Sequence, residues 1–165
     1  MLVVENDLEI EDDIIPWGNI VNGQKQYPLH EFQKEIVDSE TRFTAAIAGT
    51  GGGKTVIGPI WLSKQIQKCI DKGEKFLGMV VAPTYKVLSR ATVPALIDTY
   101  KGTGLEGVWK ESRSVYVLPN DWGIIYCQGA DNPGGLEGGQ FHAVWGDEGG
   151  QFKLGVWTAI QGRTG

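Results

Sequence analysis

The spacing of hydrophobic residues changes repeatedly along the chain, and this change predicts strands separated by helices. In four stretches apolar residues recur every three or four positions, which is typical of helices that bury one face. Short continuous apolar runs of strand length are typical of parallel strands covered on both sides. We predict strands over residues 42–48, 76–82 and 141–146, and helices around residues 29–37, 57–70, 87–99 and 151–163.

Prolines and turn formers refine this pattern. Pro59 lies early in the second predicted helix, where a missing backbone donor should kink or restart it, and Pro94 should bend the third. Two β-rich stretches flank the turn formers of residues 119–123, which predicts a hairpin. The glycine-rich residues 131–140 predict a loop. This order predicts an α/β domain with a mostly parallel central sheet flanked by helices, plus a β-hairpin.

Composition indicates one globular domain. The chain has 165 residues, 41% of them hydrophobic, which suffices for a single core. We expect residues 1–26 to form an acidic arm, mobile or held by a partner, and residues 27–165 to form the domain. No apolar run approaches the roughly 20 residues of a membrane span, and the acidic start lacks the features of a secretion signal. A cytoplasmic protein is therefore expected.

Cysteine and histidine suggest no metal site. Cys69 and Cys127 stand alone and are predicted to be small buried hydrophobes. His30 and His142 have no partners at ligand spacing and are predicted to be ordinary core or surface residues. The net charge of −5 gives the chain as a whole no basic character for gripping nucleic acid.

The candidate chemistry begins with residues 48–55, Ala-Gly-Thr-Gly-Gly-Gly-Lys-Thr, between a predicted strand and a predicted helix. Glycines let successive backbone N–H groups wrap phosphates, and the helix that follows directs its partial positive charge at them. Lys54 is placed to reach the β and γ phosphates, and the Thr55 hydroxyl to bind Mg²⁺. The predicted nucleotide-binding residues of this loop are Gly49, Thr50, Gly51, Gly52, Gly53, Lys54 and Thr55.

A pair of acids follows the last predicted strand, about 90 residues beyond the loop. Asp147 is placed to hold Mg²⁺ through water. Glu148 is the natural group to orient and deprotonate the attacking water as general base. Together with the loop, this pair predicts an ATPase of the additional-strand, RecA-like class of P-loop NTPases, with ATP and Mg²⁺ as its ligands.

The order of these segments resembles the ATPase domain of the large terminase subunit of tailed bacteriophages. Residues 27–33, Tyr-Pro-Leu-His-Glu-Phe-Gln, resemble the adenine-reading segment of that family, which implies that Gln33 contacts adenine. Residues 82–84, Ala-Pro-Thr, resemble a motif shared by terminases and helicases. Residues 136–138, Leu-Glu-Gly, resemble a segment that terminases often write with Arg in the middle.

The chain departs from the family pattern in three ways. The loop has Thr50 and three glycines where many terminases place a basic residue, and Glu137 stands where an Arg would act on a neighbouring subunit's γ-phosphate. Arg163 is a candidate substitute for that trans-acting or sensor cation, although a solvated Arg at a helix end explains it as well. We expect the domain to be truncated before the strand that couples hydrolysis to movement in this family, and the nuclease domain to be absent.

The resemblance implies a motor that drives double-stranded DNA into a procapsid. It further implies a homo-oligomeric ring, with portal protein and small terminase subunit as partners, in the host cell cytoplasm and transiently on the procapsid. Two alternatives remain. The chain could be the motor half of a helicase or DNA translocase, which shares several of these motifs, or a nucleotide-binding assembly module without turnover. The glycines after Glu148 favour terminase over helicase, and Glu148 itself argues against a purely binding site.

Overall fold

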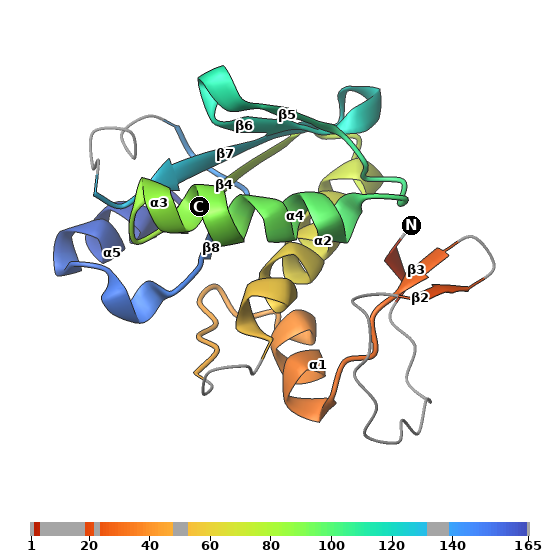
Figure 1. The fold of residues 1–165 in the computed structure, drawn as a ribbon, viewed down its shortest axis with the longest axis horizontal. Coiled ribbons are helices and arrows are strands. Elements are labelled where there is room, and N and C mark those ends of the chain that lie inside the picture. Colours follow the sequence, from red (N-terminus) through yellow and green to blue (C-terminus); the bar gives the residue numbers. More distant parts are fainter. Residues whose placement is uncertain (1, 4–18, 22–23, 48–52, 132–138, 165) are drawn as a thin grey trace.

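A five-stranded mixed sheet forms the centre of the computed structural model, which describes residues 2–3, 19–21, 24–47, 53–131 and 139–164 (Figure 1). The strand order is β5-β6-β7-β4-β8. Three strands are parallel to one another, β7 (Gly123–Gly129), β4 (Phe76–Ala82) and β8 (Ala143–Gly146). The antiparallel part consists of β5 (Val108–Lys110) and β6 (Val115–Val117). The predicted α/β class, parallel core and hairpin are confirmed.

Helices cover both faces of this sheet. On one face α2 (Lys54–Asp71) and α4 (Val93–Tyr100) pack over a core to which β4 contributes Val80 and Ala82. On the other face α5 (Leu154–Gln161) packs over a core to which β4 contributes Met79 and Val81. Because successive side chains of a strand point to opposite faces, the unbroken apolar run of β4 serves both cores.

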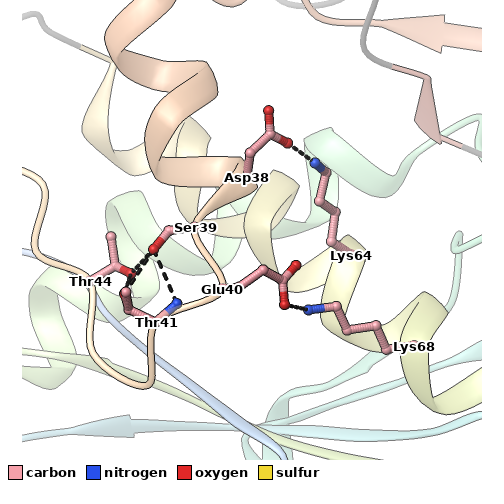
Figure 2. Close-up of polar contacts among 7 residues, drawn as sticks. All are labelled: Asp38, Ser39, Glu40, Thr41, Thr44, Lys64 and Lys68. Carbon is pink, nitrogen blue, oxygen red and sulfur yellow. Dashed lines mark hydrogen bonds and ion pairs between the residues drawn. The ribbon is translucent and has the colours of Figure 1, made fainter.

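The helix α1 (Glu31–Asp38) packs beside α2 rather than on the sheet, with Tyr27, Val37 and Ile60 in a core of their own (Figure 1). Two ion pairs join the end of α1 and the segment just beyond it to α2, Asp38 to Lys64 and Glu40 to Lys68, the latter at 2.7 Å. Figure 2 shows both lysines reaching from α2 toward these acids. Such exposed pairs contribute at most about 1 kcal/mol each, but they hold the chain against α2.

A cluster of hydroxyl groups shapes the turn that follows. Ser39, Thr41 and Thr44 lie within hydrogen-bonding distance of one another, with Oγ–Oγ distances of 2.8 to 2.9 Å (Figure 2). Thr41 Oγ1 also donates to the carbonyl of Phe43. These are short-range bonds of the kind by which Ser and Thr stabilise turns, so the cluster is explained by local structure.

The strand predicted for residues 42–48 is wrong over the described residues 42–47, which form no strand. Phe43 is 53% exposed and Ile47 88% exposed, where burial on both faces was expected. The reason is the absence of a strand beside it: β8 pairs with β4, and on its other side the described residues provide only a parallel bridge between Phe141 and Thr164. The side chain of Arg42 donates to the carbonyls of Gln161 and Thr164, so the contact of this segment with the neighbouring segment is made by a side chain and not by strand pairing.

The proline predictions had different outcomes. The helix α2 runs unbroken from Lys54 to Asp71 with Pro59 inside it, so of the two expected effects, a kink or a restart, the restart does not occur. Before Pro94, by contrast, the predicted third helix divides into α3 (Tyr85–Val87), the π-helical turn η1 (Leu88–Thr92) and α4. Pro94 has no N–H to donate to the carbonyl of Arg90, and its ring crowds that carbonyl, which favours a wider turn there.

The remaining elements are short. The arm predicted for residues 1–26 contains a small sheet that the sequence pattern did not predict, formed by β1 (Leu2–Val3), β3 (Gln24–Gln26) and β2 (Asn19–Val21) in that order. In the described part of the chain there are also three 3₁₀ turns, η2 (Glu111–Arg113), η3 (Pro119–Asp121) and η5 (Gly149–Gln151). Among the described residues, no helix combines the length and apolar character needed to cross a bilayer.

Both cysteines are buried and unpaired, as predicted. Burial raises the pKa of the Cys127 thiol to about 12. Burial also raises the pKa of the Cys69 thiol, with Glu74 adding to the effect. Both thiols therefore behave as small hydrophobes.

A close approach between α2 and β8 depends on Gly58. A Cβ atom at this position would lie 1.9 Å from Cε2 of Trp145, far inside van der Waals contact. The indole ring of Trp145 thus lies directly on the backbone of α2, and any side chain at Gly58 would push the helix away from the strand.

We predict that Gly58→Ala destabilises the protein, although Ala normally stabilises a helix interior by roughly 0.5–1 kcal/mol relative to Gly. Overpacking against Trp145 should cost about 1–3 kcal/mol instead. Gly155→Ala in α5 is the matched control, because nothing lies within 4 Å of a Cβ there. Thermal unfolding would measure both, and a Gly58→Ala variant as stable as the control would contradict the close approach.

Candidate nucleotide-binding site

The first turn of α2 carries Lys54 and Thr55, directly after the loop predicted to bind phosphate. Gly53 caps this helix with φ 69° and ψ 17°, a left-handed conformation that glycine adopts without strain. The free N–H groups and partial positive charge of a helix amino end favour a bound anion. Gly49, Thr50, Gly51 and Gly52 lie outside the described residues, and their role as phosphate ligands remains a prediction.

Asp147 follows β8 at the carboxyl end of the parallel strands, where ligands of such sheets bind. Its backbone N–H donates to the carbonyl of Val81 at 2.8 Å and so continues the pairing of β8 with β4. The side chain is only 3% exposed. The structure therefore holds a carboxylate at a fixed place inside the protein, where the sequence pattern predicted one.

The hydroxyl groups of two threonines meet this carboxylate. Thr55 Oγ1 donates to Asp147 Oδ1 at 3.4 Å, and Thr92 Oγ1 donates to Asp147 Oδ2 at 2.7 Å. The first contact joins residues 92 positions apart in the chain, the beginning of α2 and the end of β8. Two residues predicted separately to serve one metal ion thus lie side by side.

The environment of Asp147 raises its pKa above the usual range. Burial is the main cause, because it withdraws water from the charged form. The hydrogen bond from Thr92 opposes this rise, the negative charge of Glu148 adds to it, and the Thr55 hydroxyl and the backbone N–H of Glu148 oppose it. A carboxylate in this setting would gain strongly from a bound cation.

The residues present fit a magnesium ion. Mg²⁺ prefers oxygen ligands in an octahedron at about 2.0–2.1 Å, in which neighbouring ligands lie about 3 Å apart. Thr55 Oγ1 and Asp147 Oδ1 are hard oxygen donors separated by 3.4 Å, so an ion bound by Thr55 would have a water ligand within reach of the Asp147 carboxylate. Thr55 would bind the ion directly and Asp147 would hold it through water, and this assignment remains a prediction.

Glu148 has a strained backbone next to this site. Its φ of 51° and ψ of 38° lie in the left-handed region, which non-glycine residues rarely adopt. Its side chain is exposed, and its carbonyl accepts the N–H of Gln151 in the turn η5. Strain of this kind costs about 1–3 kcal/mol and gathers at functional sites. The Glu148 carboxylate is exposed beside the buried Asp147, which suits a group that must contact water.

Gln33 is buried and already serves a structural purpose. Its Oε1 accepts the backbone N–H of His30 at 3.2 Å and forms part of the capping box of α1. Tyr27 is also buried, with its hydroxyl donating to the carbonyl of Thr99. Capping and packing therefore account for these positions, and contact of Gln33 with adenine remains a prediction.

Arg163 lies far from the acids within its own chain. Its carbonyl accepts the N–H of Phe141, which precedes β8, whereas Asp147 follows β8. The backbone of Arg163 is thus at the opposite end of that strand. The prediction that Arg163 acts on a neighbouring subunit therefore remains. Residues 136–138, which include Glu137, lie outside the described residues.

Folding also brings together Cys69, Glu74 and His142, whose ligand atoms lie within 4.8 Å of one another. The Nδ1 of His142 accepts the N–H of Leu77 at 3.0 Å, so in the neutral ring the proton sits on Nε2, the nitrogen that faces Glu74 at 4.0 Å. A metal would have to displace the proton on Nε2 and that of the Cys69 thiol, whose pKa burial raises. The cluster therefore fits the predicted structural role of His142 better than a metal site.

Thr92 is the residue at this site that the sequence analysis missed. It falls in a predicted helix, outside the apolar face and outside any motif. Its only signal was Pro94 two residues later, which marked an irregular helix without indicating where the hydroxyl would point.

No family model and no curated protein matches the chain in sequence. Its structure is similar to the large terminase ATPase domain of Thermus phage P74-26, with a TM-score of 0.63, 20% identity, and coverage of 83% of this chain and 60% of that one. A mutant form of the same domain matches equally. The large terminase of a thermophilic bacteriophage is also similar, with a TM-score of 0.65, 13% identity, and coverage of 82% and 36%.

These likenesses and the site together define the class of fold, a P-loop NTPase fold with a mixed sheet flanked by helices. Its particular form is that of large terminase ATPase domains. The chain spans less than two thirds of the length of both structures, and at such identities the likeness establishes the fold alone.

We predict that Asp147→Asn raises the melting temperature of the nucleotide-free protein at pH 7. A raised pKa in the folded state means that ionised Asp147 costs stability, and this cost grows as pH rises from the ordinary value of 3.8 through the folded pKa. Below both values the cost vanishes, so the two proteins should converge in acid. Glu35→Gln, an exposed position in α1, is the control, and a gain that does not shrink with falling pH would contradict the burial argument.

Proposed function

We propose that this chain is the ATP-hydrolysing motor domain of a viral DNA-packaging terminase, which drives double-stranded DNA into a procapsid. The observation that carries the proposal is the 3.4 Å contact between Thr55 at the start of α2 and Asp147 after β8. It unites the end of a glycine-rich loop with a buried acid at the carboxyl end of a parallel sheet. The fold of the neighbours, large terminase ATPase domains, agrees with this function.

Each residue of the site has a defined part in this proposal. Lys54, at the amino end of α2, places a positive charge on the β and γ phosphates. Thr55 and Asp147 hold Mg²⁺, which neutralises charge on the phosphates when bound. Glu148 orients the attacking water and accepts its proton, since its exposed carboxylate is free of the bonds that hold Asp147.

The partners follow from the same proposal. The domain acts in a homo-oligomeric ring with portal protein and small terminase subunit, in the host cytoplasm and on the procapsid, and Arg163 is the candidate cation offered to a neighbouring subunit. The net charge of −5 means that any DNA contact depends on a local basic surface.

A helicase or translocase motor, and a binding module without turnover, are the alternatives. ATP hydrolysis that double-stranded DNA stimulates without strand separation, together with DNA uptake by procapsids, supports packaging. Strand separation would support a helicase. Nucleotide binding without any hydrolysis would support the binding module.

We predict that Glu148→Gln leaves ATP affinity nearly unchanged while turnover falls by about 10²- to 10⁴-fold, the usual contribution of a general base. Steady-state hydrolysis and ATP titration would measure the two effects. Glu111→Gln, at an exposed position in η2, is the control and should keep both properties. Hydrolysis by Glu148→Gln at the parent rate would show that another group is the base.

We predict that Lys54→Ala weakens ATP binding itself, because the charge that faces the phosphates is lost. Lys72→Ala, just beyond α2 at an exposed position, is the matched control. Calorimetric titration with a non-hydrolysable ATP analogue measures the affinity directly. Equal affinities for the parent and Lys54→Ala would remove this lysine from the site.

A further inference from the structure

Thr92 holds the acid of the site more tightly than any other side chain does in the described structure. It is fully buried, at 0% exposure, and its Oγ1 lies 2.7 Å from Asp147 Oδ2. We propose that Thr92 is a positioning residue that fixes the Asp147 carboxylate in the orientation in which its other oxygen holds Mg²⁺, through water, beside Thr55. This inference rests on the proposed function.

The two hydroxyl contacts of Asp147 differ in a way that assigns different tasks to them. The bond from Thr92 is short, as expected for a hydroxyl that donates to a charged carboxylate. The contact from Thr55 is 3.4 Å long and lies at the outer limit of a hydrogen bond. Thr92 therefore anchors Oδ2, while Thr55 and Oδ1 remain available to a third partner between them.

The π-helical turn explains why Thr92 can reach this place. In η1 the N–H of Val93 donates to the carbonyl of Leu88, five residues back, instead of four. The turn thus accommodates an additional residue and changes the direction of the side chains around it. Such turns are frequent at functional sites, and here the last residue of the turn is the one that contacts the acid.

The burial of Asp147 makes this anchor necessary. At 3% exposure the carboxylate has little water to satisfy its oxygens, and a buried charge without a partner is costly. Groups that orient a metal ligand from behind typically contribute 10- to 100-fold to metal affinity. Loss of the Thr92 hydroxyl should therefore reduce the gain in nucleotide affinity that Mg²⁺ provides more than it reduces affinity without Mg²⁺.

The test compares Thr92→Val, which keeps the shape but removes the hydroxyl, with Thr92→Ser, which keeps the hydroxyl. A non-hydrolysable ATP analogue is titrated calorimetrically into each protein with and without Mg²⁺. We expect Mg²⁺ to tighten binding by the parent and by Thr92→Ser, and this gain to fall about 10- to 100-fold in Thr92→Val. Affinity without Mg²⁺ should change little, and in hydrolysis the half-saturating Mg²⁺ concentration should rise more than kcat falls.

Thr99→Val is the matched control, since Thr99 is buried in the adjoining helix α4 and its hydroxyl donates only to the carbonyl of Ala95 among the contacts described. It should keep the full gain from Mg²⁺. If Thr92→Val does not fold, Thr92→Ala takes its place in the comparison with Thr92→Ser.

Three results would overturn the inference. An undiminished gain from Mg²⁺ in the variant without the hydroxyl would assign Thr92 to packing alone and leave the proposed function intact. Equal losses with and without Mg²⁺ would indicate general damage to the site, again without affecting the proposed function. A parent protein whose nucleotide binding does not respond to Mg²⁺ would refute the proposed function and the role of Thr92 together.

Discussion

The burial of a carboxylate beside the amino end of a helix is the constraint on which the rest of this structure depends. Asp147 sits at the end of β8 with 3% of its surface exposed, and the first turn of α2 approaches it closely enough for Thr55 to touch Oδ1. That approach requires α2 to lie directly on β8. It is possible because Gly58 leaves room for the ring of Trp145.

This arrangement lowers the stability of the nucleotide-free protein. Burial disfavours the charged form of Asp147, and Glu148 beside it adds repulsion. Glu148 itself occupies a left-handed backbone conformation. A bound cation and polyphosphate would offset these two unfavourable free energies. Costs of this kind at neighbouring residues are typical of functional sites.

The elements around the site divide into those that create it and those that hold it. The parallel strands β4 and β8 and the helix α2 place Lys54, Thr55 and Asp147 at one edge of the sheet. The turn η1, which continues into α4, lies next to Asp147 and contributes the hydroxyl of Thr92. The helix α1 and its ion pairs to α2 steady the segment that leads to the glycine loop.

The sequence by itself determined the elements whose physics is local. The unbroken apolar run of β4, the spacing of apolar residues in α2 and α5, and the turn formers before β7 each predicted an element that the structure contains. The placement of Lys54 and Thr55 at the start of α2 and of Asp147 after β8 was also predicted, because phosphate and magnesium sites require particular residue types beside particular elements, and the ligands themselves remain a prediction.

Only the tertiary structure decided the features that depend on neighbours distant in the chain. Residues 42–47 have the composition of a buried strand but no described strand beside them, so they remain exposed, because a strand exists only through its partners. Thr92 acquires its contact with Asp147 from a π-helical turn and from the packing of a helix against a strand 55 positions away in the chain. Hydrophobic spacing carries no information about such a contact, since it records which face of an element is buried and not which polar atom meets it.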